Sequence, residues 1–137
     1  MAFPTVVSVT NSGSQAGLVN TIPVAMPATV NAGDLLLVLI GSGSNNPGAA
    51  PSGWTALYVG TSGVTGNPGV YYKFAAGTEG GTTVNFTQSS TGWYEAQCLR
   101  ITGVPLSTAP EVSAQTNGTT STPDPASVTA SWGSADN

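Results

Sequence analysis

The chain has 137 residues, which is the size of one ordinary domain and long enough to bury one hydrophobic core. Only 6% of the residues are charged, with two Lys or Arg against six Asp or Glu, so the formal net charge is -4. So few cations cannot form a phosphate-binding surface, which argues against a nucleic-acid partner. The 18 Gly and 10 Pro, together with the shortage of charged helix formers, favour an all-β protein.

The expected strands are short, evenly spaced and separated by turns rich in Gly, Pro, Asn and Ser. In chain order they are residues 5–10, 21–30, 34–41, 54–61, 70–76, 82–87 and 93–103. Pro23 and Pro27 remove two backbone donors from the second of these strands, which predicts an edge or bulged strand. The apolar run LLLVLI predicts that the third strand is central and covered on both faces. Loops are expected at residues 11–17 and 88–92.

Strands of this number and spacing predict an antiparallel β-sandwich of jelly-roll or immunoglobulin-like type. The single Cys excludes the immunoglobulin disulfide. We expect a core domain over residues 1–104, in which residues 1–30 form an extended N-terminal arm or edge strands. Residues 105–137 are polar and rich in Pro, Ser and Thr, and are expected to form an extended C-terminal arm or outer strands.

The composition also excludes several kinds of catalytic site. Without histidine, the chain cannot hold a Ser-His-Asp or Cys-His arrangement, and one Cys cannot make a zinc site. The six acids are scattered, which disfavours the carboxylate pair of a glycosidase, and Asp124 lacks the spacing of a calcium loop. We therefore expect no catalytic residue, metal or cofactor, and no enzymatic activity.

The longest apolar run is too short to cross a membrane, and the N-terminus lacks the pattern of a secretory signal peptide. We therefore expect no membrane partner, and we expect the chain to be made in the cytoplasm.

The aromatic residues are divided by strand alternation into core candidates and surface candidates. Those expected in the core are Trp54, Tyr58, Tyr72 and Phe74. Tyr71 and Tyr94 have the opposite parity, so they are candidates for contact with a ligand or a partner subunit, with plain exposure as the alternative. Trp132 is a third candidate for such a contact.

The stretch WYEAQCLRITG, residues 93–103, holds the only Cys and one of the two basic residues, as a reaction site would. With no histidine to activate it, Cys98 is interpreted as a small buried residue. Arg100 is expected to pair with a carboxylate or with loop carbonyls near Gly103. Both residues therefore have predicted structural roles.

Five short patterns follow one another along the chain. They are GDLLL at residues 33–37, GWT at 53–55, YYK at 71–73, an acidic turn before a Thr-rich strand at 79–87, and CLRITG at 98–103. In this order the chain resembles small β-sandwich proteins that tailed bacteriophages and prophages encode. In such proteins the segment ending GSADN leads into another apolar strand, whereas this chain stops at Asn137. The given chain is therefore expected to be a fragment, or to receive its last strand from another copy.

The resemblance implies a structural protein on the exterior of the phage particle. The expected function is capsid decoration, in which a cement protein binds the major capsid protein and stabilises the shell. The alternative is a carbohydrate-binding or receptor-binding domain of a tail or head fibre, with a glycan as ligand. In either role the chain is expected to act as a homo-oligomer, with a trimer favoured.

Overall fold

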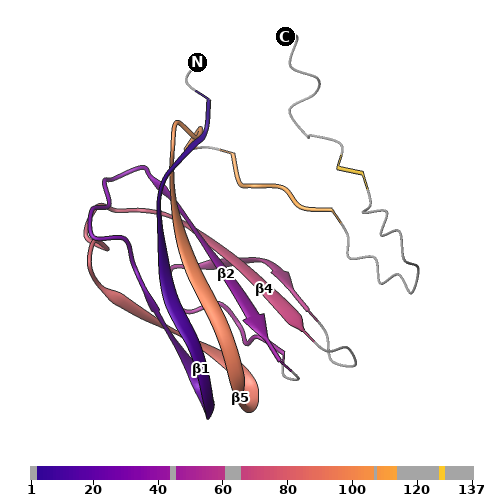
Figure 1. Cartoon of the computed structure of the whole chain (residues 1–137). Coiled ribbons are helices and arrows are strands. Elements are labelled where there is room, and N and C mark those ends of the chain that lie inside the picture. The colour runs from indigo at the N-terminus through magenta and orange to yellow at the C-terminus, as the bar shows by residue number, and fades with distance from the viewer. Residues whose placement is uncertain (1–2, 44–45, 61–65, 107, 114–126, 129–137) are drawn as a thin grey trace.

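A computed structural model describes residues 3–43, 46–60, 66–106, 108–113 and 127–128 (Figure 1). Its strands are β1 (Thr5–Ala25), β2 (Leu35–Ser42), β3 (Thr55–Val59), β4 (Asn67–Phe74) and β5 (Thr83–Thr102). They form one antiparallel sheet in the order β1-β5-β2-β4-β3, and the described residues include no helix. The predicted all-β antiparallel class is confirmed, and the assignment to a jelly-roll or immunoglobulin-like type stays a prediction.

Strands β1 and β5 are 21 and 20 residues long, and each joins two of the strands expected from the sequence. The loops predicted at residues 11–17 and 88–92 are therefore wrong, because both segments continue a strand. Each segment pairs with residues next to the other one, because Gln15 pairs with Tyr94 and Gly92 pairs with Val19. Most register shifts of the β1–β5 pairing also fall in this region, so regular pairing is interrupted there.

The interrupted region is where the ribbon bends back on itself. The Ser12 hydroxyl accepts a hydrogen bond from the Ala25 N–H at 2.8 Å, although both residues belong to β1. A straight strand would separate these residues by roughly 43 Å. The second half of β1 and the first half of β5, which pair with each other, therefore fold back over the rest of the two strands, as the turn of both strands at the bottom of Figure 1 shows.

A buried glutamine holds this bend. The Gln88 amide donates to the carbonyl oxygens of Val19 at 2.5 Å and Gly92 at 2.9 Å. Its own oxygen accepts a hydrogen bond of 2.7 Å from the Ser42 hydroxyl of β2. Because an irregular, buried backbone must find partners away from the strand ladder, this side chain replaces the pairing that the bend removes.

The core lies between the folded-back half of the ribbon and one face of the sheet, which we call the inner face. Phe86 of the folded-back half packs against the rings of Tyr71 at 4.9 Å and Trp54 at 5.4 Å between centroids. Full burial of one such side chain contributes about 2–3 kcal/mol. Other buried apolar residues of this core are Ile22, Val24, Met26, Val30, Leu36, Val38, Ile40, Tyr94, Ala96 and Cys98.

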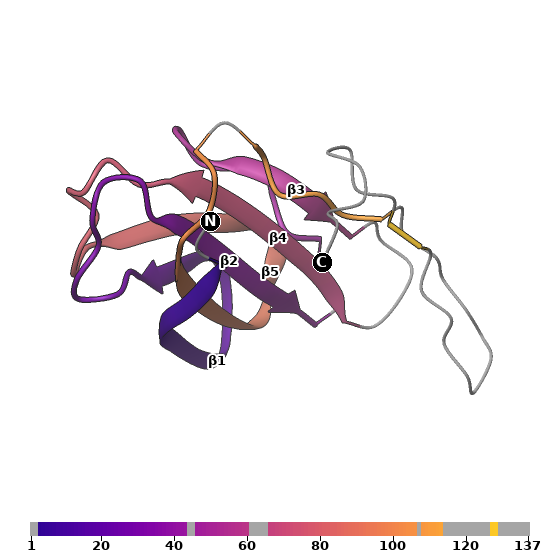
Figure 2. The same cartoon turned by 90° about the horizontal axis from the view of Figure 1, so that it is seen from above.

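The N-terminal segment is not a free arm. Residues 5–25 pair with β5 of the same chain along the whole of β1, which lies at one edge of the sheet as Pro23 and its neighbours predicted. Figure 2 shows β1 and β3 at opposite edges. After β5, the described residues 103–106 and 108–113 add no strand, and most of the segment predicted as a C-terminal arm lies outside the described residues.

Candidate interaction surface

Two of the predicted contact residues lie in the core. Tyr71 and Tyr94 expose 0% and 1% of their surface, so the prediction that they meet a ligand or partner is wrong. Alternation had correctly separated Tyr71 from Tyr72, but both faces of the sheet are apolar, so the pattern could not identify the inner one. The Tyr71 hydroxyl donates to the Gly48 carbonyl oxygen at 2.6 Å, and burial raises the pKa of Tyr71 to about 12, so the donor keeps its proton.

The remaining predicted site residues have simpler outcomes. Trp132 lies outside the described residues. Cys98 is fully buried, as predicted, and its Sγ lies 3.8 Å from the Sδ of Met26. Arg100 donates through Nε to the Asp34 carboxylate at 2.5 Å, so of its two predicted kinds of partner the structure shows the carboxylate. Cys98 does not have the surroundings of a reactive thiol, because burial raises its pKa to about 12 and so keeps it protonated.

Both cations of the chain belong to one cross-strand row. Arg100 of β5 and Lys73 of β4 are the two neighbours of Leu36 of β2, which is fully buried. Arg100 is paired with Asp34, and the Lys73 Nζ lies 2.8 Å from a carboxylate oxygen of Glu79. The two ion pairs close this end of the core on either side of Leu36, so neither cation is left to bind an anionic ligand.

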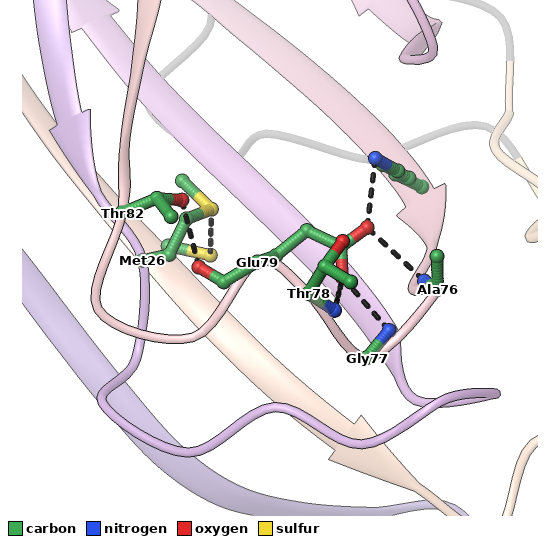
Figure 3. Close-up of polar contacts among 8 residues, drawn as sticks. Met26, Ala76, Gly77, Thr78, Glu79 and Thr82 are labelled. Carbon is green, nitrogen blue, oxygen red and sulfur yellow. Dashed lines mark hydrogen bonds and ion pairs between the residues drawn. The ribbon is translucent and has the colours of Figure 1, made fainter.

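Glu79 organises the turn between β4 and β5 (Figure 3). Besides Lys73, its carboxylate accepts hydrogen bonds from the backbone N–H groups of Ala76, Gly77 and Thr78 at 2.9–3.0 Å. Burial acts to raise the pKa of Glu79, but the hydrogen bonds and the charge of Lys73 outweigh it and lower the pKa to about 2. The carboxylate is therefore ionised and fully used inside the fold.

Glu79 and Glu95 are not brought together as a catalytic carboxylate pair. Glu79 is occupied by its own turn, whereas Glu95 is exposed beside Gly41, five residues further along β2 than Leu36. Five residues of strand correspond to roughly 16 Å, beyond the separation of glycosidase carboxylates. Among the described residues, no group of three or more potential metal ligands is brought together either. These residues also contain no helix that could span a membrane.

The feature that stands out is the second face of the sheet, which we call the outer face. Residues that pair across four or five of the strands form three successive rows on it. The first row is Val6, Ile101, Leu35 and Phe74, the second is Val9, Leu99, Leu37, Tyr72 and Thr55, and the third is Asn11, Gln97, Leu39, Val70 and Tyr58. The three rows contain no charged side chain and only three polar ones, so this face is as apolar as a core.

The outer face also explains why three of the four predicted core aromatics are misplaced. Trp54 is buried as predicted, but Tyr58, Tyr72 and Phe74 lie on the outer face and are only partly buried. Tyr72 and Phe74 pack edge to face with their centroids 6.0 Å apart. The rings therefore do form an apolar cluster, on the side of the sheet away from the folded-back ribbon.

Beyond the third row the outer face becomes polar and then ends in an exposed tryptophan. Glu95 and Gly41 pair in the next row, and Trp93 follows on β5 with 64% of its surface exposed. Its indole lies over Gly43, where an added Cβ atom would come within 2.9 Å of the ring. A glycine is needed at this position because any side chain would displace the ring.

Trp93 was not among the contact residues predicted from the sequence, although the sequence contains a signal for its exposure. Trp93 shares its parity with Glu95 and Gln97, and a tryptophan in register with polar residues on one strand face is a surface candidate. The apolar outer face had a signal too, since LLLVLI predicted a strand covered on both sides.

The geometry is that of a β-domain with one face packed and one apolar face partly exposed. A comparison of the chain with models of protein families, with curated proteins and with solved structures found no match.

Proposed function

We propose that this chain is a structural subunit that completes its burial within a larger assembly, and that the assembly is a bacteriophage virion. The observation that carries the proposal is the uncharged, apolar outer face. Large contiguous apolar patches on a folded domain mark surfaces that bind another macromolecule. The centres of such interfaces are depleted of charge, as the three rows of the outer face are.

The more specific role we propose is capsid decoration. The chain would bind major capsid protein on the outside of the shell, as a small oligomer, and hold neighbouring capsomers together by passive contact. Its sequence resemblance to small phage β-sandwich proteins supports this role. The use of both cations inside the fold also supports it, because what remains is a neutral to acidic surface suited to protein contacts.

Imaging of purified virions tests this role. We expect density for the chain across the shell, at a copy number comparable with that of the major capsid protein. Virions made without the chain should release their genome at a lower temperature, and adding back the purified chain should restore the wild-type temperature. A few copies per particle, or localisation to the tail, would exclude a shell-wide cement.

A second candidate function is favoured by Trp93. An exposed indole on the same strand face as exposed Glu95 is the kind of platform on which sugar rings stack, so the chain would then be a carbohydrate-binding or receptor-binding domain of a fibre. A glycan array compares the wild type with Trp93→Ala, and Leu106→Ala serves as control because Leu106 is also 64% exposed. Binding that only Trp93→Ala abolishes supports this candidate, and an array without binding excludes it for the glycans tested.

A further inference from the structure

We propose that the outer face binds the outer face of a second copy of this chain, so that two sheets pack face to face around a twofold axis. The proposal extends the assembly role above by naming the partner that covers this surface.

The charge distribution of the chain favours a contact between the outer faces of two copies. Two copies that each carry a net charge of -4 repel each other wherever acidic surfaces meet. The three apolar rows of the outer face contain no charge, so two copies can approach there without placing like charges together. A charged partner of another kind would form no ion pair with an uncharged face. A second acidic copy avoids like-charge repulsion only where both surfaces are uncharged.

The outer face is also self-complementary. In a twofold contact the same surface patch is used by both partners, so an effective patch must suit itself. The outer face offers rows of branched aliphatic residues with Tyr72 and Phe74 between them, and two such sheets interdigitate at a distance of about 10 Å. Polar Gln97 lies in the last of the three rows and exposed Glu95 lies just beyond it, where a polar rim is expected.

The area of the outer face can be compared with the area that a protein–protein interface buries. The 14 residues of the three rows, about 4.8 Å apart across the strands and about 6.6 Å apart along them, cover a flat patch of roughly 400–450 Å², in which Leu35 is already buried. Side-chain surface is larger than its projection, so the area buried per partner exceeds this patch but stays below the roughly 800 Å² per partner of a standard interface. The face is therefore large enough for a weak, reversible dimer.

The test uses the purified full-length chain in the absence of phage. Sedimentation equilibrium should show a reversible dimer over about 1–500 µM, the range of weak to moderate affinities. The variant Val6→Asp/Val9→Asp places two carboxylates on the outer face, at positions that are 50% and 51% exposed and so tolerate a polar residue. We expect it to weaken dimerisation at least tenfold while it keeps the wild-type circular dichroism spectrum.

The matched control is Thr83→Asp/Asn85→Asp. It adds the same charge to exposed strand positions on the folded-back half of β5, away from the outer face, and should dimerise like the wild type. Should Val6→Asp/Val9→Asp unfold, Val6→Thr/Val9→Thr keeps the strand propensity and should weaken the dimer in the same direction.

Several results would overturn the proposal. A wild-type chain that stays monomeric over the whole range shows that no second copy covers the face, as when another segment of the chain does. An oligomer that withstands the substitutions at Val6 and Val9 uses another surface. A dimer whose chain is absent from virions would leave this inference standing and remove the proposed function, whereas a virion-bound monomer would do the reverse.

Discussion

The two basic residues of this chain have structural roles. The chain has only two cations, and each lies beside the buried Leu36 and pairs with a carboxylate that also accepts backbone N–H groups. A partly buried ion pair is costly to break because the remaining charge is left without a partner. Substitution of either cation should therefore affect stability more than a typical surface substitution does.

For the first ion pair, Arg100→Ala should lower the free energy of unfolding by about 2–3 kcal/mol, because it leaves the Asp34 carboxylate buried beside Asn31 without its cation. Urea denaturation measures the loss. The variant Asp34→Asn keeps an acceptor for the Asn31 N–H, and the double variant should lose less than the two single variants added together. An unchanged midpoint for Arg100→Ala would contradict a structural role for Arg100.

For the second ion pair, stability should depend on pH through Glu79. Its folded-state pKa of about 2 lies below its ordinary 4.5, so its contribution is present above pH 4.5 and is lost as the pH falls from 4.5 toward 2. Solvent screening reduces that contribution to about 1–2 kcal/mol. Urea denaturation across this pH window should show a steeper fall for the wild type than for Glu79→Gln.

The control for this measurement is Glu95→Gln, because Glu95 is exposed. Its pH dependence should match that of the wild type. Equal slopes for all three proteins would mean that the Glu79 turn contributes nothing to acid stability.

At the scale of elements, residues typical of turns mark bends here. The segments NSGSQAG and QSSTG predicted loops, because Gly, Ser and Asn favour chain reversal. In the structure they lie at the irregular part of the β1–β5 pairing, where a two-stranded ribbon bends, and a bend needs the same small and adaptable residues. Local composition therefore located the change of direction correctly, but it could not distinguish a loop from a bent strand.

Strand glycines differ according to what lies above them. A Cβ atom at Gly69 would lie 2.7 Å from the Cβ of Pro47 and 2.9 Å from the Tyr71 ring, whereas at Gly41 the nearest atom would be 4.0 Å away. Gly69→Ala should therefore lower the free energy of unfolding by about 1–3 kcal/mol. Gly41→Ala should change it by less than about 0.5 kcal/mol, because the site is open. Comparable thermal shifts for the two variants would show that Pro47 does not pack tightly on β4.

At the scale of the whole molecule, the two sheet faces decide the behaviour of the chain. One face is covered by the folded-back ribbon, and the other presents three apolar rows from which charge is absent. A domain of this size needs most of its apolar surface buried to be stable, so covering the second face should add to its stability.

Cys98 reports on the opening of the whole molecule. It is fully buried in the second half of β5, and burial raises the pKa of its thiol to about 12. We expect a thiol-specific reagent at mildly alkaline pH to label it at least about 10³-fold more slowly in buffer than in urea, because labelling requires unfolding. Spectrophotometric labelling kinetics measure this ratio, and a rate near that of a free thiol would place Cys98 at the surface.

The amino-acid sequence by itself determined the all-β class and the burial of Cys98, and it limited the Pro-containing segment to an edge or bulged strand and Arg100 to a carboxylate or loop-carbonyl partner. These features depend on local chemistry: strand propensity, missing backbone donors, and the cost of leaving a cation unpaired. Only the tertiary structure decided which face of the sheet is the core. Alternation separates Tyr71 from Tyr72, but when both faces are apolar it cannot say which one the bent ribbon covers, because that depends on contacts between residues far apart in the chain.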